Sequence, residues 1–438
     1  MSSRAQGQPL MVAARQTETL GVTIAKASLC HAEGSAEGLL KGIELQAPPS
    51  GPSARILVAG DICAAHAHLV PAGQGSDAPW SGLQGSIREH DLSLATIECP
   101  LTVREGAILK SGPLLRAHPA WASTVRLGGF DLVSLANNHI RDYGAAGVLE
   151  TVAACESAGL QTVGAGEDLA HARLPAIRSV ADLKIGVLAV AENEFGSAGQ
   201  GRAGGNPFDP LTTPRDVHAL SGETDAVLVM LHGGTEHYRL PSPNMTRICR
   251  ALVEAGASAV VCSHTHVPSG LEIHEGAPIV YGTGNFFFPP GHRVGDEWYL
   301  GYCVSMWIGC NGVWRLALVP YRQRAGRGVV EPLSDAPARD LMRQTMELSA
   351  TIGDDERLAE RWREFCRVHR ATTLGTVLGL TRVERRLVRH GVWPFWRLPR
   401  RRVPGLLNVV RCESHRERLI TTLKIEHEEG EQEEEDGR

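Results

Sequence analysis

The sequence has few aromatic residues, no long apolar segment and little net charge. Only 5% of its 438 residues are aromatic, and no window approaches the ~18 consecutive apolar residues of a membrane-spanning helix. Residues 1–16 lack the apolar stretch and cleavage site of a secretory signal, so we expect a cytoplasmic protein without a transmembrane segment. With 43% hydrophobic and 21% charged residues, the composition excludes collagen, coiled coil and disorder as whole-chain descriptions.

The cysteines show no pairing pattern. The ten cysteines lack close paired spacings, so neither a zinc ribbon nor a small disulfide framework is indicated. The net charge of −5 hides a segregation: residues 426–438 contribute −7, and residues 382–418 contribute +8 through eleven arginines and three glutamates. Because the remainder is mildly acidic, we expect no nucleic-acid partner.

The chain divides into four predicted regions. Residues 1–54 lack periodicity and end in a Pro- and Ser-rich cluster that is typical of a linker. Residues 55–325 alternate short apolar runs with amphipathic stretches, which predicts an α/β domain with a largely parallel sheet. Residues 326–420 are expected to form a helical, arginine-rich extension, and residues 421–438 an acidic, disordered tail.

Five short apolar runs in the second region each end in polar residues. We expect strands over residues 55–59, 92–97, 130–136, 226–231 and 259–262, with further candidates at 184–190 and 279–281. Helices are expected over residues 145–158 and 244–255. A hairpin is expected around Asn311-Gly312, at the edge of the sheet or in a second sheet.

The polar residues after these runs are candidate metal ligands. They are Asp61, Glu98, Asn138, His139, His232, His264 and His266. Ligands of parallel α/β sheets gather beyond the carboxyl ends of the strands, so we expect these side chains to lie together. Carboxylates, an amide and imidazoles suit Mn²⁺, Fe²⁺ or Zn²⁺, and we expect one or two such ions per chain.

Two features of this set bear on a two-metal site. Glu98 is the best candidate for a carboxylate that bridges two metals. If residues 263–266 continue as a strand, His264 and His266 point the same way, whereas in a turn they can bracket two metals. His139 would lie beside a bound substrate as a general acid or an electrostatic stabiliser.

The motifs around these residues resemble those of a known family. In chain order they are Gly60-Asp61, Glu98-Cys99-Pro100, Ala136-Asn137-Asn138-His139 with Asp142 and Gly144, Leu231-His232-Gly233-Gly234 with Glu236 and Tyr238, Ser263-His264-Thr265-His266-Val267, and Tyr281-Gly282-Thr283-Gly284-Asn285-Phe286. Together they resemble the CapA-type proteins of poly-γ-glutamate capsule synthesis, which belong to the calcineurin-like metallophosphoesterase superfamily. The resemblance covers about residues 55–322 and implies layered sheets flanked by helices.

The resemblance also implies roles for individual residues. One metal would be held by Asp61, Glu98 and His266, and the other by Glu98, Asn138, His232 and His264. His139 would be the catalytic histidine, oriented by Asp142, with Glu236 as a further catalytic candidate. Cys63 stands where the superfamily has a ligand histidine, and is either a soft ligand or a packing residue.

Four further features stand out, and three of them have two interpretations each. Arg116 either clamps a substrate carboxylate or forms a surface salt bridge, and His237 is either a substrate-binding acid or base or an exposed loop residue. The Gly-rich segment 194–206 is expected to be a mobile loop over the site. The arginine-rich stretch, with Trp393 and Trp396, forms a polyanion-binding or membrane-binding surface or, as we favour, a solvated helical cap.

Three functions are compatible with these residues. The leading hypothesis is a metal-dependent hydrolase of a peptide-like or γ-glutamyl substrate. The resemblance to the family implies the substrate, and the resemblance to the superfamily implies hydrolysis. Some relatives in the family epimerise residues of ribosomal peptides, so the alternative is a metal-assisted Cα epimerase in which His139 works with Cys63, Glu236 or His237. The third hypothesis is a non-catalytic accessory subunit whose partner is a polyglutamate ligase.

Overall fold

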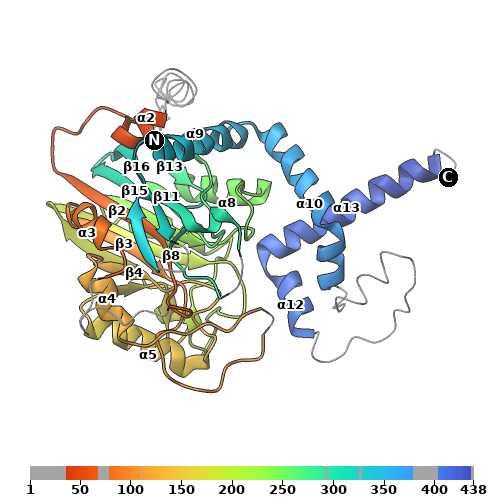
Figure 1. Cartoon of the computed structure of the whole chain (residues 1–438), viewed down its shortest axis with the longest axis horizontal. Helices are drawn as coiled ribbons and strands as arrows, with labels where there is room; N and C mark the ends of the chain where they lie inside the picture. Colours follow the sequence, from red (N-terminus) through yellow and green to blue (C-terminus); the bar gives the residue numbers. More distant parts are fainter. Residues whose placement is uncertain are drawn as a thin grey trace, which may run out of the picture.

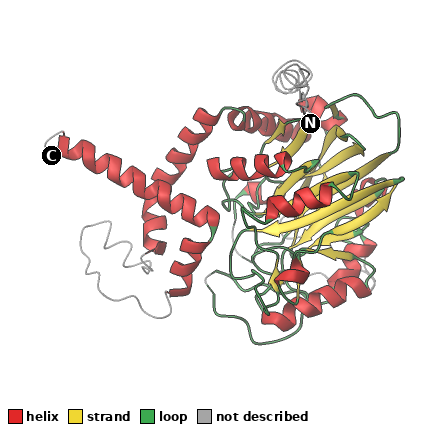
Figure 2. Cartoon of the chain, turned by 180° about the vertical axis from the view of Figure 1, so that it is seen from behind, coloured by secondary structure: helices red, strands yellow, loops and turns green. Residues whose placement is uncertain are grey.

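The apolar runs of the sequence build two β-sheets. The computed structural model describes residues 36–67, 78–110, 112–291, 294–324, 328–377 and 403–435. Helices lie on the outer sides of the sheets, and a further group of helices stands beside them at the C-terminal end of the chain (Figures 1 and 2). The expected fold class, layered α/β sheets flanked by helices with a helical C-terminal extension, is therefore confirmed.

The first sheet has nine strands in the order β1-β16-β15-β2-β3-β4-β5, with β14 pairing with β2 and β17 with β16. The strands are β1 (Ile43–Glu44), β2 (Ser53–Ile62), β3 (Leu92–Ile97), β4 (Leu132–Ser134), β5 (Gln161–Val163), β14 (Asn285–Phe287), β15 (Leu300–Gly309), β16 (Gly312–Arg324) and β17 (Val329–Pro332). β2 to β5 run parallel, whereas the hairpin β15–β16 adds to β2 in antiparallel orientation.

The second sheet has six strands in the order β12-β13-β11-β10-β8-β7. The strands are β7 (Ala176–Val180), β8 (Leu183–Ala191), β10 (Ala226–His232), β11 (Ala259–Ser263), β12 (Leu271–His274) and β13 (Ala277–Val280). β8, β10, β11 and β13 are parallel to one another, and antiparallel β7 and β12 form the edges. The short strands β6 (Ala165–Gly166) and β9 (Gly204–Gly205) pair separately.

The main hydrophobic core lies between the two sheets. Strand residues alternate between faces, and in β2 the side chains of Ile56 and Val58 join one cluster with Val187 and Leu228 of the second sheet. Leu57, the residue between them, faces the opposite way into a cluster with the outer helices. This alternation makes four layers, with helices outside and two sheets inside.

Each outer face is covered by its own helices. The first sheet packs against α3 (Ser81–Arg88), α4 (Trp121–Leu127) and α5 (Gly144–Ser157), and the second against α7 (Thr213–Ser221) and α8 (Pro243–Glu254). α2 (Ala36–Lys41) lies beside α9 (Asp335–Ile352), and α6 (Leu169–Ala172) and the 3₁₀ helix η1 (Asp296–Tyr299) are short. α8 begins as helices commonly do: Ser242 caps it by accepting from the Met245 N–H, and Pro243 follows.

The C-terminal extension is helical, but it differs from expectation at its end. It comprises α10 (Asp355–Val377), α12 (Val403–Arg411) and α13 (Glu413–Glu435), and α13 packs against α10 and α12. Residues 421–435 continue α13, whereas the sequence predicted disorder; glutamate has a high intrinsic helix propensity, which accounts for the difference. Trp393 and Trp396 lie outside the described residues.

Two other expectations need correction. The five site-bearing runs belong to two sheets rather than one, with β2, β3 and β4 in the first and β10 and β11 in the second. The Gly-rich segment 194–206 is packed rather than free, because β9 pairs with β6 and Gly196 lies against the Asn137 backbone. No described helix combines the length and apolarity needed to span a bilayer. The cytoplasmic location stays a prediction.

Candidate metal centre and the pocket beside it

The candidate ligands come from both sheets and meet where the carboxyl ends of the strands converge. Asp61 and His232 lie at the ends of β2 and β10, Glu98 directly follows β3, and His264 and His266 follow β11. With Asn138, these side chains are between 0% and 8% exposed. The six ligands predicted from sequence are therefore brought together in a buried cluster, even though they come from two sheets.

One group of donor atoms surrounds Nε2 of His232. This nitrogen lies 3.2 Å from Asn138 Oδ1, 3.2 Å from His264 Nδ1 and 3.7 Å from Glu98 Oε1. Ligand atoms that share a metal with bonds of roughly 2.1 Å are about 3.0–3.4 Å apart. The spacing around His232 therefore fits one shared cation.

A second group shares Glu98 with the first. Asp61, Glu98 and His266 offer ligand atoms that all lie within 4.8 Å of one another, as do Glu98, His232 and His264. His266 Nε2 lies 3.8 Å from Glu98 Oε1. Because Glu98 belongs to both groups, it occupies the position that a carboxylate bridging two metals requires.

The two histidines after β11 belong to different groups because the backbone turns there. β11 ends at Ser263, and His264 and His266 then adopt φ values of 92° and 61°. Left-handed backbone at a residue other than glycine costs on the order of 1–3 kcal/mol, and such strain concentrates at functional sites. Of the two arrangements that the sequence allowed, the structure has the turn.

Glu98 is the most unusual charged group of the cluster. The side chain is fully buried, and neither carboxylate oxygen has a hydrogen-bond partner among the described residues. Burial, together with the neighbouring carboxylates Asp61 and Glu236, raises the pKa of Glu98 well above its ordinary value. A buried carboxylate without donors is costly unless a cation neutralises it, so these oxygens fit a bound divalent metal.

The imidazoles are oriented by hydrogen bonds at their other ring nitrogens. His266 Nδ1 lies 2.9 Å from Asn285 Oδ1, and His232 Nδ1 lies 3.0 Å from Ser263 Oγ. Such outer contacts fix the ring and leave the second nitrogen free for a metal. Burial lowers the pKa of His266, which favours the neutral imidazole that can bind a metal.

Asn137 ties the loop after β4 to the end of β3. Its Nδ2 donates to Ile97 O at 2.8 Å, and its Oδ1 accepts from the His139 N–H at 3.0 Å. This pair of hydrogen bonds places Asn138 and His139 next to Glu98. Asn137 therefore stabilises the loop, and Asn138 faces the cluster of candidate ligands.

His139 is held by two charged residues. Its Nδ1 lies 2.8 Å from Asp142 Oδ2 and 3.0 Å from Lys110 Nζ, and Lys110 also forms an ion pair with Asp142. Burial lowers the pKa of His139, against the opposing effect of Asp142. With Nδ1 engaged, Nε2 is the ring nitrogen that remains to exchange a proton with a ligand.

A pocket of about 430 Å³ opens beside this cluster. Its lining includes four residues that the sequence singled out: Asn138, His139, Glu236 and His237. His237 adopts φ 61° and donates its backbone N–H to Thr265 O, so the loop after β10 is tied to the His264–His266 turn. The cluster of candidate ligands and the pocket share Asn138 and thus form one continuous candidate site.

Several lining residues were missed by the sequence. They are Lys110, Gly112, Pro113 and Thr235 of the domain, and Phe365, His369, Asn408, His415 and Arg418 of the C-terminal helices. Glu194 also lines the pocket and begins the Gly-rich segment that was expected over the site. Lys110 stands alone in a segment without periodicity, and the helical residues lie far along the chain from the motifs. The arginine-rich composition of residues 382–418 includes Arg418, but it does not single this residue out from the other arginines.

Arg116 and Cys63 are placed differently from their functional interpretations. Arg116 donates to the backbone oxygens of Val103 and Arg104 and lies 4.8 Å from the centre of the Tyr143 ring, so its guanidinium is used locally and does not line the pocket. Cys63 is fully buried in the core of the first sheet, and burial and its Cys99 neighbour raise the pKa of its thiol. It is a packing residue there.

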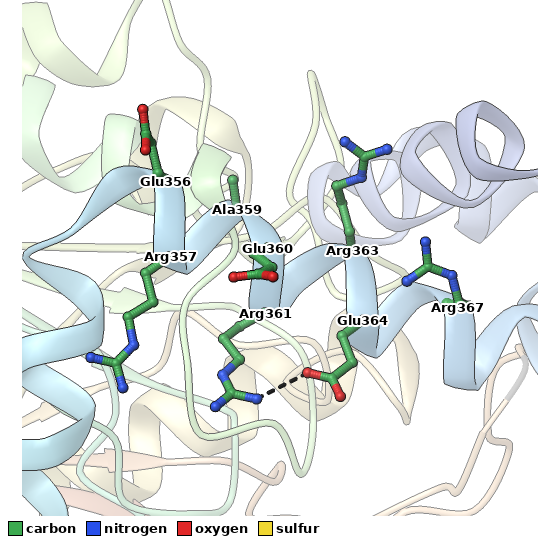
Figure 3. Close-up of a pocket in the computed structure, with 8 residues that line it drawn as sticks. All are labelled: Glu356, Arg357, Ala359, Glu360, Arg361, Arg363, Glu364 and Arg367. Carbon is green, nitrogen blue, oxygen red and sulfur yellow. Dashed lines mark hydrogen bonds and ion pairs between the residues drawn. The ribbon is translucent and has the colours of Figure 1, made fainter. Parts of the chain in front are cut away.

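Another hollow lies away from the candidate site. It measures about 870 Å³ and is lined by eight residues, all from α10. Figure 3 shows alternating arginine and glutamate side chains on successive turns, with Arg361 ion-paired to Glu364 at 3.0 Å. An open, mixed-charge surface of one helix does not converge on a ligand, and none of the residues singled out in the sequence lies in it.

Comparison with known proteins identifies the family. Residues 55–290 match the family model described as "Bacterial capsule synthesis protein PGA_cap". The chain belongs to this family. It is 30% identical over 219 residues to the capsule biosynthesis protein CapA of Bacillus anthracis, which covers 48% of this chain and 52% of that protein. It is 26% identical over 253 residues to the PGA biosynthesis protein CapA of Bacillus subtilis, covering 56% and 65% respectively.

Other matches are more distant or shorter. A probable polyglutamine synthesis accessory protein of Mycobacterium tuberculosis is 32% identical over 209 residues, 44% of this chain and 55% of that protein. The chain thus spans between about half and two thirds of the length of these relatives. The structure of a 5′-nucleotidase precursor from Thermus thermophilus superimposes with a TM-score of 0.39 and 14% identity, covering 67% of this chain and 58% of that one. A score this low carries no functional conclusion.

Proposed function

We propose that the chain is a divalent-metal-dependent enzyme that hydrolyses a peptide-like or γ-glutamyl substrate at a binuclear centre. The observation that carries the proposal is Glu98, whose two buried, unpartnered oxygens lie between two groups of nitrogen and oxygen donors. Oxygen and imidazole donors suit Mn²⁺, Fe²⁺ or Zn²⁺. The residues present therefore fit the metal centre, with Asp61, Glu98 and His266 for one ion and Glu98, Asn138, His232 and His264 for the other.

The contacts suggest separate roles for the metal ions and for the side chains beside them. A bound metal supplies Lewis acidity toward a carbonyl and acidifies water. His139, neutral and held through Nδ1 by Asp142, exchanges a proton with the substrate through Nε2. Glu236 lines the same pocket and is the second candidate for exchanging a proton with the substrate.

The substrate class rests on family membership. The Bacillus relatives are named for capsule and PGA biosynthesis, and the mycobacterial relative for polyglutamine synthesis. A γ-glutamyl chain is a peptide-like polyanion, and its amide carbonyl is a group that a metal centre polarises. These names support the substrate class, and the donor cluster supports the chemistry.

Hydrolysis is tested in ¹⁸O-labelled water. The Mn²⁺-loaded protein is incubated with a γ-glutamyl oligomer, and the products are analysed by mass spectrometry. We expect shorter oligomers, of which the fragment with the new carboxyl group carries one ¹⁸O. Their formation should fall at least about 100-fold in His139→Ala, because general acid–base catalysis contributes roughly 10²–10⁴-fold. The absence of cleavage with γ-glutamyl and ordinary peptides alike, in protein shown to hold metal, contradicts the proposal.

A Cα epimerase is the second candidate function. It is favoured by His139 and the Glu236–His237 pair, which follow β4 and β10 respectively and line one pocket, so that two groups can reach a Cα proton from different loops. The packing position of Cys63 removes it from this set. Epimerisation in D₂O adds one deuterium to the peptide without cleavage, whereas hydrolysis shortens it, so the same mass spectra separate the two reactions.

A ligase partner is the third proposal. It is supported by the word "accessory" in the name of the mycobacterial relative. If the chain acts only by binding a polyglutamate ligase, His264→Ala should stimulate the ligase as well as wild type does. Loss of stimulation together with loss of metal instead favours a role for the metal centre.

A further inference from the structure

The C-terminal helices form part of the pocket wall. α10, α12 and α13 gather at one side of the sheets (Figure 1, in blue). They contribute Phe365, His369, Asn408, His415 and Arg418 to the 430 Å³ pocket that His139 and Glu236 also line. All five residues lie beyond residues 55–290, the part of the chain that matches the family model. This wall is therefore an addition to the matched region.

The start of α13 is fixed to the domain by two carboxylates. Glu413 accepts from the backbone N–H of Asn193 at 3.1 Å and from its Nδ2 at 2.8 Å. Glu417 accepts from Ser242 Oγ at 2.5 Å and from the Asn244 N–H at 2.9 Å, at the N-terminus of α8. A carboxylate is favourable at a helix N-terminus. These contacts hold the first two turns of α13 against the domain.

Further polar contacts join the same helix to the loop after β8. Ser414 donates to the buried carboxylate of Glu192, and Asn408 of α12 donates to Glu194 at 3.3 Å. The following turn of α13 then presents His415 and Arg418, three residues apart and therefore on one helical face, to the pocket. The position of Arg418 is set by the docking contacts of Glu413, Ser414 and Glu417, which precede it in the helix.

Arg418 forms no ion pair within the described residues, although the Glu236 carboxylate lines the same pocket. Its buried Nε has no hydrogen-bond partner in the described part of the chain, and no carboxylate described there forms an ion pair with it. Lys110, the other permanent cation of the pocket, is paired with Asp142. Partly buried guanidinium groups are seldom left unpaired, because their desolvation is costly. An oxyanion from a ligand would supply the missing partner.

We propose that Arg418, with His415 beside it, forms a carboxylate-binding subsite that anchors the substrate in the pocket next to His139. A guanidinium matches a carboxylate in a two-point hydrogen-bonded contact, which specifies orientation as well as charge. The substrate is then a peptide-like molecule with a free carboxylate near the reacting bond, as each residue of a γ-glutamyl chain has. The inference rests on the proposed function for the identity of the pocket as the reaction site.

The test compares binding of matched probes to the full-length, metal-loaded protein. Calorimetric titrations use γ-glutamyl-glutamate, its triamide, in which all three carboxylates are blocked, and inorganic phosphate, which offers the same oxyanion chemistry from a different source. The variants are Arg418→Gln, Arg418→Lys and the control Arg416→Gln, which removes the same charge from an exposed position of α13. Melting temperatures report whether each variant is folded.

Arg418→Gln is expected to weaken binding of the dipeptide by 10- to 100-fold, as is usual for a charge-assisted hydrogen bond. Arg418→Lys should fall between wild type and Arg418→Gln, because lysine keeps the charge but loses the two-point contact. Arg416→Gln should bind like wild type. The triamide, which has no carboxylate, should bind wild type weakly and lose no further affinity in Arg418→Gln. The difference between dipeptide and triamide is measured in wild type, so it tests the subsite even if a variant is unfolded.

Three outcomes overturn the proposal. Equal dipeptide affinity in wild type and folded Arg418→Gln would make Arg418 a structural residue. An Arg418-dependent affinity for phosphate without one for the dipeptide would assign the subsite to phosphate. Absence of binding of every probe to wild type at millimolar concentration would remove the subsite altogether. If the dipeptide binds in an Arg418-dependent way but is not hydrolysed, the subsite is supported and the hydrolase is rejected. If it is hydrolysed while wild type and Arg418→Gln bind it equally well, the hydrolase is supported and the subsite is rejected.

Discussion

The ion pair behind His139 gives a prediction whose size follows from burial. The side chains of Lys110 and Asp142 are 3% and 0% exposed, and Asp142 also accepts from His139 and from the Leu115 N–H. Removing one partner of a buried ion pair leaves an uncompensated charge and costs about 3–5 kcal/mol. We therefore expect Asp142→Asn and Lys110→Met each to lower the free energy of unfolding by about 3 kcal/mol.

The double variant separates the ion pair from general damage at the site. With both charges removed, no buried charge is left unpaired, so Lys110→Met/Asp142→Asn should lose less stability than either single variant. The assay is urea denaturation, monitored by far-UV circular dichroism, with all variants at pH 7. A double variant whose loss equals the sum of the two single losses would refute the reasoning, as would single losses below about 0.5 kcal/mol.

Three further predictions concern pH and the packed glycines. Burial lowers the pKa of His90 to about 4, so the ring stays neutral in the native state while it binds a proton below about pH 6.5 in the unfolded state. The free energy of unfolding therefore falls as the pH is lowered. Between pH 7 and pH 5, wild type should lose about 2 kcal/mol more of it than His90→Gln. Burial raises the pKa of Glu192 to about 8, so this carboxyl group is protonated in the native protein at lower pH, and the stability that the proton provides is lost as the pH rises toward 8. Between pH 6 and pH 8, the free energy of unfolding of wild type should fall by about 2 kcal/mol more than that of Glu192→Gln. Parallel denaturation curves for wild type and variant over either interval would contradict the corresponding statement. A Cβ at Gly196 would lie 2.5 Å from Asn137 O, whereas one at Gly199 would meet only an arginine side chain at 3.4 Å. Because Asn137 positions the loop that carries Asn138, Gly196→Ala should weaken metal binding by at least about 10-fold, and Gly199→Ala should not. Metal titration measures both affinities. Equal metal affinities in the two glycine variants would show that the loop does not support the site.

The ligand cluster was predictable because it depends on a local rule. Asp61, Glu98 and His232 each stand at the end of an apolar run, and the carboxyl ends of parallel strands converge. The rule holds even though β2 and β10 lie in different sheets. Which strands pair is decided by contacts between runs distant in sequence, and local periodicity does not contain that information.

The rest of the pocket was not predictable for the same reason. Arg418 reaches the pocket only because Glu413 and Glu417 dock α13 on the domain, and neither contact has a sequence motif. Arg116 illustrates the reverse: one of its two interpretations was a clamp for a substrate carboxylate, but Tyr143 and two backbone oxygens use its guanidinium. Tertiary contacts decide whether a charged side chain is available for a ligand.

The central claim is that Glu98 joins two sets of ligands around bound metal. The most direct measurement is the metal content of protein purified without chelator and then loaded with Mn²⁺ or Zn²⁺, determined by elemental analysis. We expect one or two ions per chain in wild type, loss of metal in Glu98→Gln and His264→Ala, and retention in His139→Ala, whose ring lies outside both donor groups. Wild-type protein that takes up neither metal, or Glu98→Gln protein that retains the full content, would contradict the account.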